Sequence, residues 1–98
     1  MTEKQAIKEI MRRAADIKPT VHVGKEGLSE AISLELKDQI KRAKIVKVKV
    51  LSTSGSDVAE VADSLAASTE TILVDVRGSI ALFCDRKEYR NLTQKKFQ

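Results

Sequence analysis

The sequence contains little of what most catalytic and metal sites need. It has one cysteine, one histidine and no tryptophan, and aromatic residues make up only 3% of its 98 residues. One cysteine excludes an internal disulfide, and His22 without a second ligand at metal spacing argues against a metal site. No serine or cysteine carries a nucleophile signature that would pair with this imidazole. We therefore expect a binding protein without a cofactor, not an enzyme.

Long apolar runs are also absent. No stretch approaches the length of a membrane-spanning helix. The N-terminus lacks the charged segment and apolar core of a signal peptide. We therefore expect a cytoplasmic protein with no membrane partner. A length of 98 residues fits one domain, and no repeat or linker divides it, so residues 1–98 are expected to form a single domain and a monomer.

The net charge of +4 is unevenly distributed along the chain. Residues 1–50 hold twelve Lys and Arg against seven Asp and Glu, whereas residues 51–76 hold none against five. Residues 77–98 hold six against two. Such segregation indicates that one element faces away from a polyanion while the others face it. A soluble protein with an uneven surface charge is the alternative interpretation.

Hydrophobic periodicity predicts alternating helices and strands. The predicted order is helix, strand, helix, strand, helix and two hairpin strands, over residues 2–18, 20–23, 29–44, 45–51, 56–66, 71–76 and 80–83. Thr2 and Gln5 read as a capping box for the first helix, and Pro19 ends it. The two strands that flank the second helix form a β-α-β unit and should be parallel.

The turn between the first strand and the second helix reads Gly24, Lys25, Glu26 and Gly27. Glycine lets the oxygens of a ligand approach the main chain closely. The helix that begins near Ser29 adds unpaired amide groups and the positive end of its dipole. This layout is typical of phosphate binding, and Lys25 would lie where the phosphate passes, although an isolated pair of glycines more often forms a plain turn.

Basic residues follow this turn on the second helix and the second strand. Lys37, Lys41 and Lys44 fall on one side of the helix, away from its apolar stripe. Lys47 and Lys49 alternate with valines in the strand. We expect these lysines to extend one positive track from the glycine turn, with ordinary solvated faces as the alternative.

Other charged segments complete the pattern. Arg77, beside the predicted hairpin turn, is a further candidate phosphate contact, with an ordinary exposed hairpin residue as the alternative. The third helix has an acidic polar face with Asp57, Glu60 and Asp63, so we expect it to lie off the binding surface. Residues 86–98 carry basic residues among two aromatics and are interpreted as a basic, flexible tail, which could contact phosphates and stack on bases or could be an ordinary solvated terminus.

Several segments, taken together and in order, resemble the signature segments of the CRM domain. They are Ile17-Lys18-Pro19, Val23 to Ser29, Ile45 to Lys49 and Arg77-Gly78. The CRM domain is the RNA-binding module of YhbY-like ribosome-assembly proteins. The resemblance extends from about Lys4 to Asp85 and is much more specific than the glycine turn alone.

This resemblance implies an α/β fold with a four-stranded mixed sheet and packed helices, similar to the C-terminal domain of initiation factor three, and no enzymatic activity. It gives the turn from Gly24 to Gly27 the role of the KH-domain loop, which clamps the nucleic-acid backbone, and assigns the role of the basic strand to Lys47 and Lys49. The implied partner in bacterial members is pre-ribosomal large-subunit RNA, whereas plant organellar relatives assist group II intron splicing. Members often end the last strand with Tyr-Arg, where this sequence has Cys84-Asp85.

Two alternative functions fit parts of the sequence. An Alba-like chromatin protein that binds DNA or RNA shares the broad order of strands and helices, but Gly27 and the N-terminal helix argue against it. A protein-interaction adaptor would use Leu34, which falls among the lysines of the second helix, and the acidic third helix.

Overall fold

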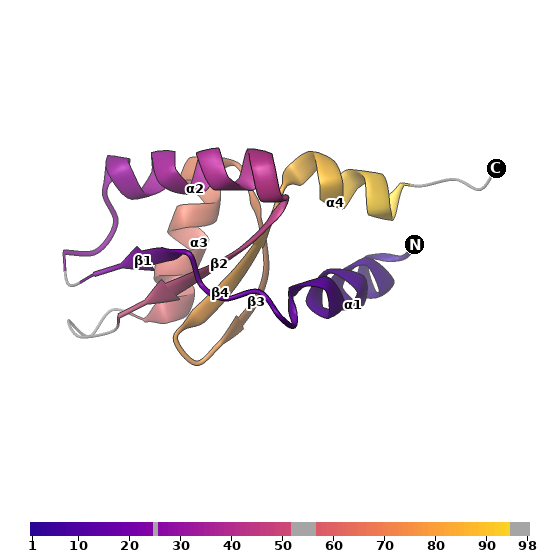
Figure 1. The fold of residues 1–98 in the computed structure, drawn as a ribbon, viewed down its shortest axis with the longest axis horizontal. Helices are drawn as coiled ribbons and strands as arrows, with labels where there is room; N and C mark the ends of the chain where they lie inside the picture. The colour runs from indigo at the N-terminus through magenta and orange to yellow at the C-terminus, as the bar shows by residue number, and fades with distance from the viewer. Residues whose placement is uncertain (25, 52–56, 95–98) are drawn as a thin grey trace.

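Four helices and four strands form within the residues that the structure describes, which are 1–24, 26–51 and 57–94 (Figure 1). In this computed structural model they follow the order α1 (Glu3–Ala14), β1 (Val21–Val23), α2 (Glu30–Ala43), β2 (Ile45–Val50), α3 (Val58–Thr69), β3 (Ile72–Arg77), β4 (Ile80–Cys84) and α4 (Arg86–Thr93). The predicted α/β fold is confirmed, with one helix more than expected. None of the helices in these ranges is long and apolar enough to cross a membrane.

The strands form one mixed sheet in the order β1-β2-β4-β3. β1 pairs in parallel with β2, with Val21 opposite Val48, so the predicted parallel β-α-β unit is confirmed. β4 pairs antiparallel with both β2 and β3. The β3–β4 hairpin turns at Gly78, whose φ of +57° lies in the left-handed region that glycine adopts most readily.

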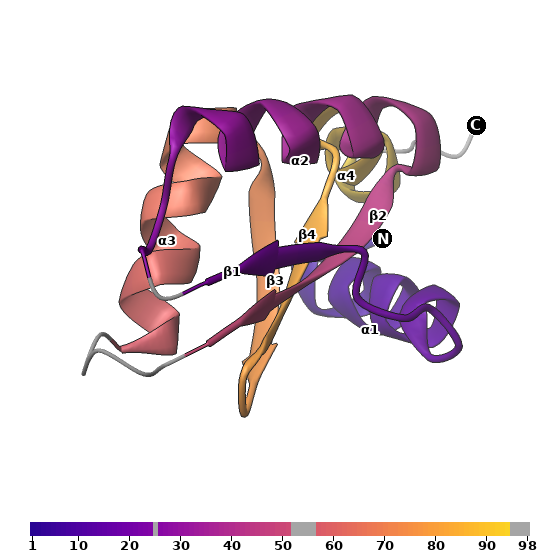
Figure 2. The same ribbon diagram turned by 60° about the vertical axis from the view of Figure 1, so that its left-hand side comes forward.

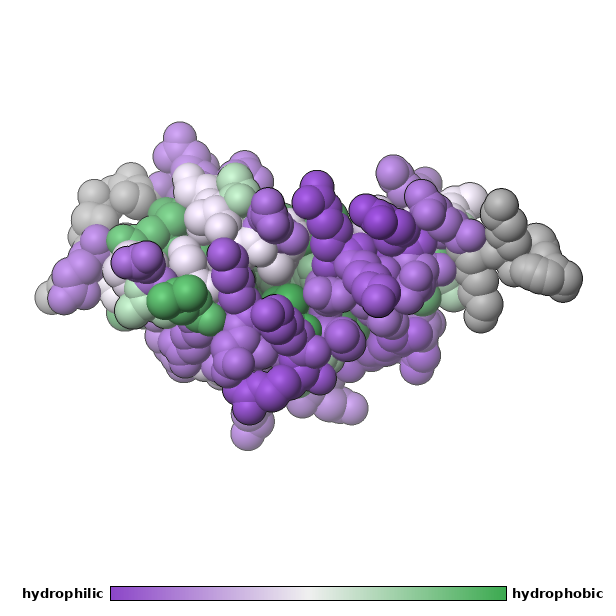
Figure 3. All heavy atoms as spheres, turned by 90° about the horizontal axis from the view of Figure 1, so that it is seen from above, coloured by the Kyte–Doolittle hydropathy of each residue, from purple (hydrophilic) through white to green (hydrophobic). Residues whose placement is uncertain are grey.

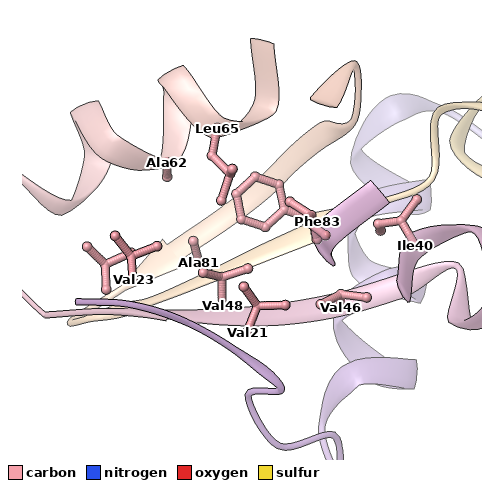
Figure 4. Packing of buried hydrophobic residues seen from close by; sticks show 11 residues of the cluster. Val21, Val23, Ile40, Val46, Val48, Ala62, Leu65, Ala81 and Phe83 are labelled. Carbon is pink, nitrogen blue, oxygen red and sulfur yellow. The ribbon is translucent and has the colours of Figure 1, made fainter. Parts of the chain in front are cut away.

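The larger hydrophobic core lies between one face of the sheet and the helices α2 and α3 (Figures 2 and 4). Alternation in β2 turns Val46, Val48 and Val50 toward these helices. Figure 4 shows Phe83 in the middle of this layer, beneath Leu65 of α3. This packing explains why the apolar stripes of α2 and α3 face the same sheet.

A smaller core covers one end of the opposite sheet face, beneath α1 and α4. Ile10 and Ala14 of α1 pack there against Ile45, Leu82 and Cys84. Burial is the main cause that raises the pKa of the Cys84 thiol to about 12, so the thiol stays protonated at neutral pH. Cys84 therefore packs as a small hydrophobic residue.

Helix α4 occupies residues that the sequence assigned to a flexible tail. The side chain of Asp85 caps it by accepting a hydrogen bond from the Glu88 amide at 3.1 Å. Glu88 also forms an ion pair with Arg13 of α1 at 3.1 Å, and Leu92 is buried in the smaller core. Residues 86–93 are thus ordered against α1, while 95–98 lie outside the described residues. Asp85, one of the two residues that differ from the Tyr-Arg pair of the CRM resemblance, thus caps the N-terminus of this helix.

Strand β3 contains a bulge that decides which way its last side chains point. Leu73 and Asp75 face consecutive residues of β4, which leaves Val74 as the extra residue. As a result Leu73 and Val76 both pack against the larger core, although they are three positions apart. Asp75 and Arg77 lie on the opposite face of the sheet. Without the bulge, regular alternation from Leu73 would point the side chains of Asp75 and Arg77 into the larger core.

Deleting Val74 is expected to preserve the fold and to lower the free energy of unfolding by only about 1–2 kcal/mol, the loss of one partly buried valine. The shortened strand would pair regularly and keep Asp75, Val76 and Arg77 on their present faces. Deleting Val48 from β2 is the control, because it would turn Lys49 into the core and unfold the protein. Urea unfolding followed by circular dichroism measures both, and equal destabilisation would contradict the bulge.

Candidate nucleic-acid interface

The glycine turn connects β1 directly to the N-terminus of α2. The Gly27 amide donates a hydrogen bond to the Gly24 carbonyl at 3.0 Å, which closes a tight turn. Gly27 has a φ of +79°, a conformation that residues with side chains rarely adopt. Ser29 then caps α2 by accepting a hydrogen bond from the Ile32 amide at 3.3 Å. Lys25, the candidate phosphate contact within the turn, lies outside the described residues.

Gly24 and Gly27 differ in how well their positions would accept a side chain. A Cβ atom at Gly24 would meet nothing closer than the Glu26 carboxylate oxygen at 3.5 Å, an ordinary contact. At Gly27 there is open space for a Cβ, but the backbone conformation would be strained. The same 3.5 Å distance places the exposed Glu26 carboxylate beside Gly24. A bound phosphate near Gly24 would therefore meet a negative charge as well as main-chain amides.

The candidate lysines Lys37 and Lys41 of α2, and Lys44 at its C-cap, are all exposed. Lys37 and Lys41 border a shallow hollow of about 280 Å³, together with Glu70 and Asp85. Lys44 ends α2 in the left-handed conformation, with a φ of 72°. Its carbonyl accepts a hydrogen bond from the Asp85 amide at 2.8 Å, so α4 begins beside the end of α2.

Helix α4 extends the exposed basic surface of α2. It turns Tyr89 and Leu92 toward α1, which leaves the exposed Arg86 and Lys87 on the other side of the helix, whereas Arg90 lines a hollow with Arg13 of α1. Figure 1 shows α2 and α4 along one side of the molecule, and Figure 3 shows mainly hydrophilic residues over α4 and the adjoining end of α2, with hydrophobic residues among them over the start of α2. We define the α2–α4 surface as Lys37, Lys41, Lys44, Arg86 and Lys87.

Lys47, Lys49 and Arg77 lie on the opposite side of the sheet from α2. The valines of β2 pack against α2 and α3, so the alternating lysines must face away from them. Arg77 joins them because of the bulge in β3. The expected single track from the turn to β2 is therefore wrong in its geometry, since the structure separates the candidates into two surfaces. The alternation of valine and lysine in the sequence of β2 already indicates that its lysines face away from the helices that cover its valines.

His22 also lies on this second surface, where it is exposed and pairs in register with Lys49. Within the described ranges, no three His, Cys, Asp or Glu side chains come together in a way that could hold a metal ion. We define the sheet surface as His22, Lys47, Lys49 and Arg77, with Asp75 beside Arg77.

The acidic residues of the third helix are exposed on α3. α3 packs beside α2 on the same face of the sheet, and the Ser33 and Ser68 hydroxyls of the two helices lie 3.0 Å apart. The negative charge thus borders the α2 side of the molecule, away from the sheet surface. The expectation that α3 lies off the RNA-binding surface stays a prediction.

Comparisons with known proteins bear on the family and the fold of the chain. A family model, the CRS1 / YhbY (CRM) domain, matches residues 1–84, which include the glycine turn, α2, the basic strand and the hairpin but not α4. Among solved structures, the chain is similar to the hypothetical protein SAV1595 from Staphylococcus aureus, described as a candidate RNA-binding protein. The two are 27% identical with a TM-score of 0.74, over 88% of this chain and 90% of that one. No curated protein sequence matches the chain. These similarities support RNA binding.

Proposed function

This chain belongs to the CRS1/YhbY (CRM) domain family, and we propose that it binds ribosomal or pre-ribosomal RNA of the large subunit during ribosome assembly. The observation that carries the proposal is the turn from Gly24 to Gly27, which leads β1 into the N-terminus of α2. In this proposal, main-chain amides of the turn and of the first turn of α2 hold one phosphate. Binding requires no cofactor and no catalytic step, and the protein acts as a cytoplasmic monomer.

The α2–α4 surface then contacts neighbouring phosphates. Its exposed lysines and Arg86 provide charge, and long cationic side chains at a solvated surface suit RNA backbone contacts. Aromatic residues are only 3% of the chain, which leaves few platforms for stacking on bases. Recognition through RNA shape and backbone is therefore favoured over sequence readout on this side.

Replacing Lys37 and Lys41 together with glutamine is expected to weaken binding to a large-subunit RNA fragment. It should also reduce the steepness of log affinity against log salt by about 1.4–1.8, since each lost phosphate contact removes about 0.7–0.9. The matched control replaces Lys4 and Lys8 of α1, which have the same spacing and are also exposed. Filter binding over a range of salt concentrations measures both variants. An equal change in the two would mean that only net charge matters.

The cellular partner is tested by crosslinking in cells followed by sequencing of the bound RNA. Reads concentrated in large-subunit precursor RNA are expected, and these reads should decrease in the Lys37 and Lys41 variant. Reads spread over other RNAs would overturn the role in assembly while leaving RNA binding intact. Competition with excess duplex DNA distinguishes an Alba-like function, in which DNA would displace the RNA.

The adaptor alternative also has a structural basis, because Leu34 of α2 is 58% exposed. A single exposed leucine is common on protein surfaces and does not form a docking patch by itself. If the protein were an adaptor, the Lys37 and Lys41 variant would retain its partners in cells.

A further inference from the structure

Among the described residues, α1 and α4 cover only part of one sheet face, and two cross-strand rows of side chains lie at the edge of α1 and beyond it. In the first row, Lys47 of β2 pairs with Leu82 of β4, which pairs with Asp75 of β3. In the second row, the order from β1 to β3 is His22, Lys49, Ile80 and Arg77. Each row therefore places an aliphatic side chain of β4 between polar or cationic side chains on the neighbouring strands.

A hollow of about 450 Å³ lies between these rows and the C-terminal end of α1. Met11, Ala14 and Ala15 of α1 line one side, and Ile80 and Leu82 contribute the aliphatic part of the sheet. Lys47, Asp75 and Arg77 supply its polar and charged lining. Its volume is within the range that small organic ligands occupy in proteins.

An ion pair within the protein orients part of the charged lining of the hollow before any ligand binds. Arg77 Nε donates a hydrogen bond to Asp75 Oδ2 at 2.9 Å, which orients the guanidinium group. The Arg77 side chain is nevertheless 76% exposed, so the flat guanidinium remains accessible to a ligand. A guanidinium plane can stack on a nucleobase while its N–H groups bind phosphate or carbonyl oxygens. The bulge in β3 is what places this pair at the hollow.

We propose that this hollow binds one unpaired nucleotide of a single-stranded RNA segment. The base lies against Ile80, Leu82 and Met11, and its edge or face contacts Arg77. Lys47 lies on β2 and Arg77 on β3, and these two strands flank β4 at about 10 Å from each other. The two side chains contact the phosphates on either side of the base. The excess of positive charge across both rows favours a polyanion as the ligand over a peptide that is basic or has few acidic residues.

This inference rests on the proposed function, since it takes RNA as the ligand, but it concerns a different surface. The sheet surface and the α2–α4 surface lie on opposite sides of the sheet. A protein with both sites holds two RNA segments at once, an unpaired segment on one side and a structured segment on the other.

The test uses two RNA probes with the full chain, a short unstructured oligouridylate and a fully paired RNA duplex. Ala15 is exposed at the end of α1 and lines the hollow, so Ala15→Trp should fill it without disturbing the core. Oligouridylate affinity is expected to fall about tenfold, close to the contribution of one packed base, while duplex affinity stays within about twofold. Ala67→Trp, at an exposed position of α3, is the matched control and should change neither affinity.

Arg77→Gln provides a second variant, should the tryptophan disturb the fold as seen by circular dichroism. It should also weaken oligouridylate binding and spare duplex binding. Oligouridylate affinity that is unchanged in both variants, or lost equally in Ala67→Trp, overturns the inference. If the wild-type protein binds the duplex but not oligouridylate, the inference fails and the proposed function stands. If it binds neither probe nor a large-subunit RNA fragment, the proposed function fails.

Discussion

Phe83→Ala is expected to lower the free energy of unfolding by about 3–5 kcal/mol. Phe83 is completely buried and is the largest of the fully buried side chains. It lies on β4, where it faces Val46 on one side and Leu73 on the other. Alanine would leave a cavity between the sheet and α3 that this tightly packed layer cannot close.

Such a loss is a large part of the 5–15 kcal/mol or so that stabilises a typical domain. Urea unfolding measures the change, and Ile80→Ala in the same strand is the control. Ile80 is only partly buried, on the opposite face of β4, so its truncation should cost clearly less than that of Phe83. Equal costs would contradict the placement of Phe83 at the centre of the larger core.

Gly24→Asp is expected to weaken RNA binding by about 10- to 100-fold, which corresponds to losing one charge-assisted contact of roughly 1.5–3 kcal/mol. The new carboxylate would stand beside Glu26 at the place proposed for a phosphate. Stability should change little, because a Cβ at Gly24 meets only an ordinary contact. Fluorescence anisotropy with a large-subunit RNA fragment and thermal unfolding measure the two quantities separately.

Gly24→Asn is the matched control, since asparagine has nearly the shape of aspartate without its charge. Its affinity should lie between those of the wild type and Gly24→Asp. The converse variant, Glu26→Gln, removes the negative charge beside Gly24 and should strengthen binding. Wild-type affinity in Gly24→Asp would remove the turn from the RNA-binding surface. Gly27 is less useful for this test, because its φ of +79° makes any replacement a folding variant too.

The division of the basic residues into two surfaces changes how the candidate site is interpreted. Spacing along the chain placed Lys44 and Lys47 close together and suggested one track. Lys44 ends a helix that packs on one face of the sheet, whereas Lys47 points from the other face. Sequence distance is a poor guide at such a junction, because a strand directs successive side chains to opposite faces.

Hydrophobic periodicity did not predict helix α4, because its apolar pattern covers only a few residues. Only Tyr89 and Leu92 mark an apolar side within its eight residues, and the segment is otherwise polar. Its order depends on the Asp85 cap, the ion pair of Arg13 with Glu88, and the burial of Leu92 beside α1. Arg13 and Glu88 are 75 residues apart in the chain, so periodicity within a window does not report on this contact.

Short-range pattern was sufficient for the order of the first three helices and the four strands, for the parallel β-α-β unit and for the glycine turn. Capping residues, proline, glycine and apolar spacing act within a few residues, so these features can be read along the chain. The bulge at Val74, the docking of α4 and the hollow beneath α1 depend instead on pairing and packing between distant segments. Asp75 and Arg77 show the difference, since regular alternation would have buried both, and only the pairing of β3 with β4 brings them to the open face.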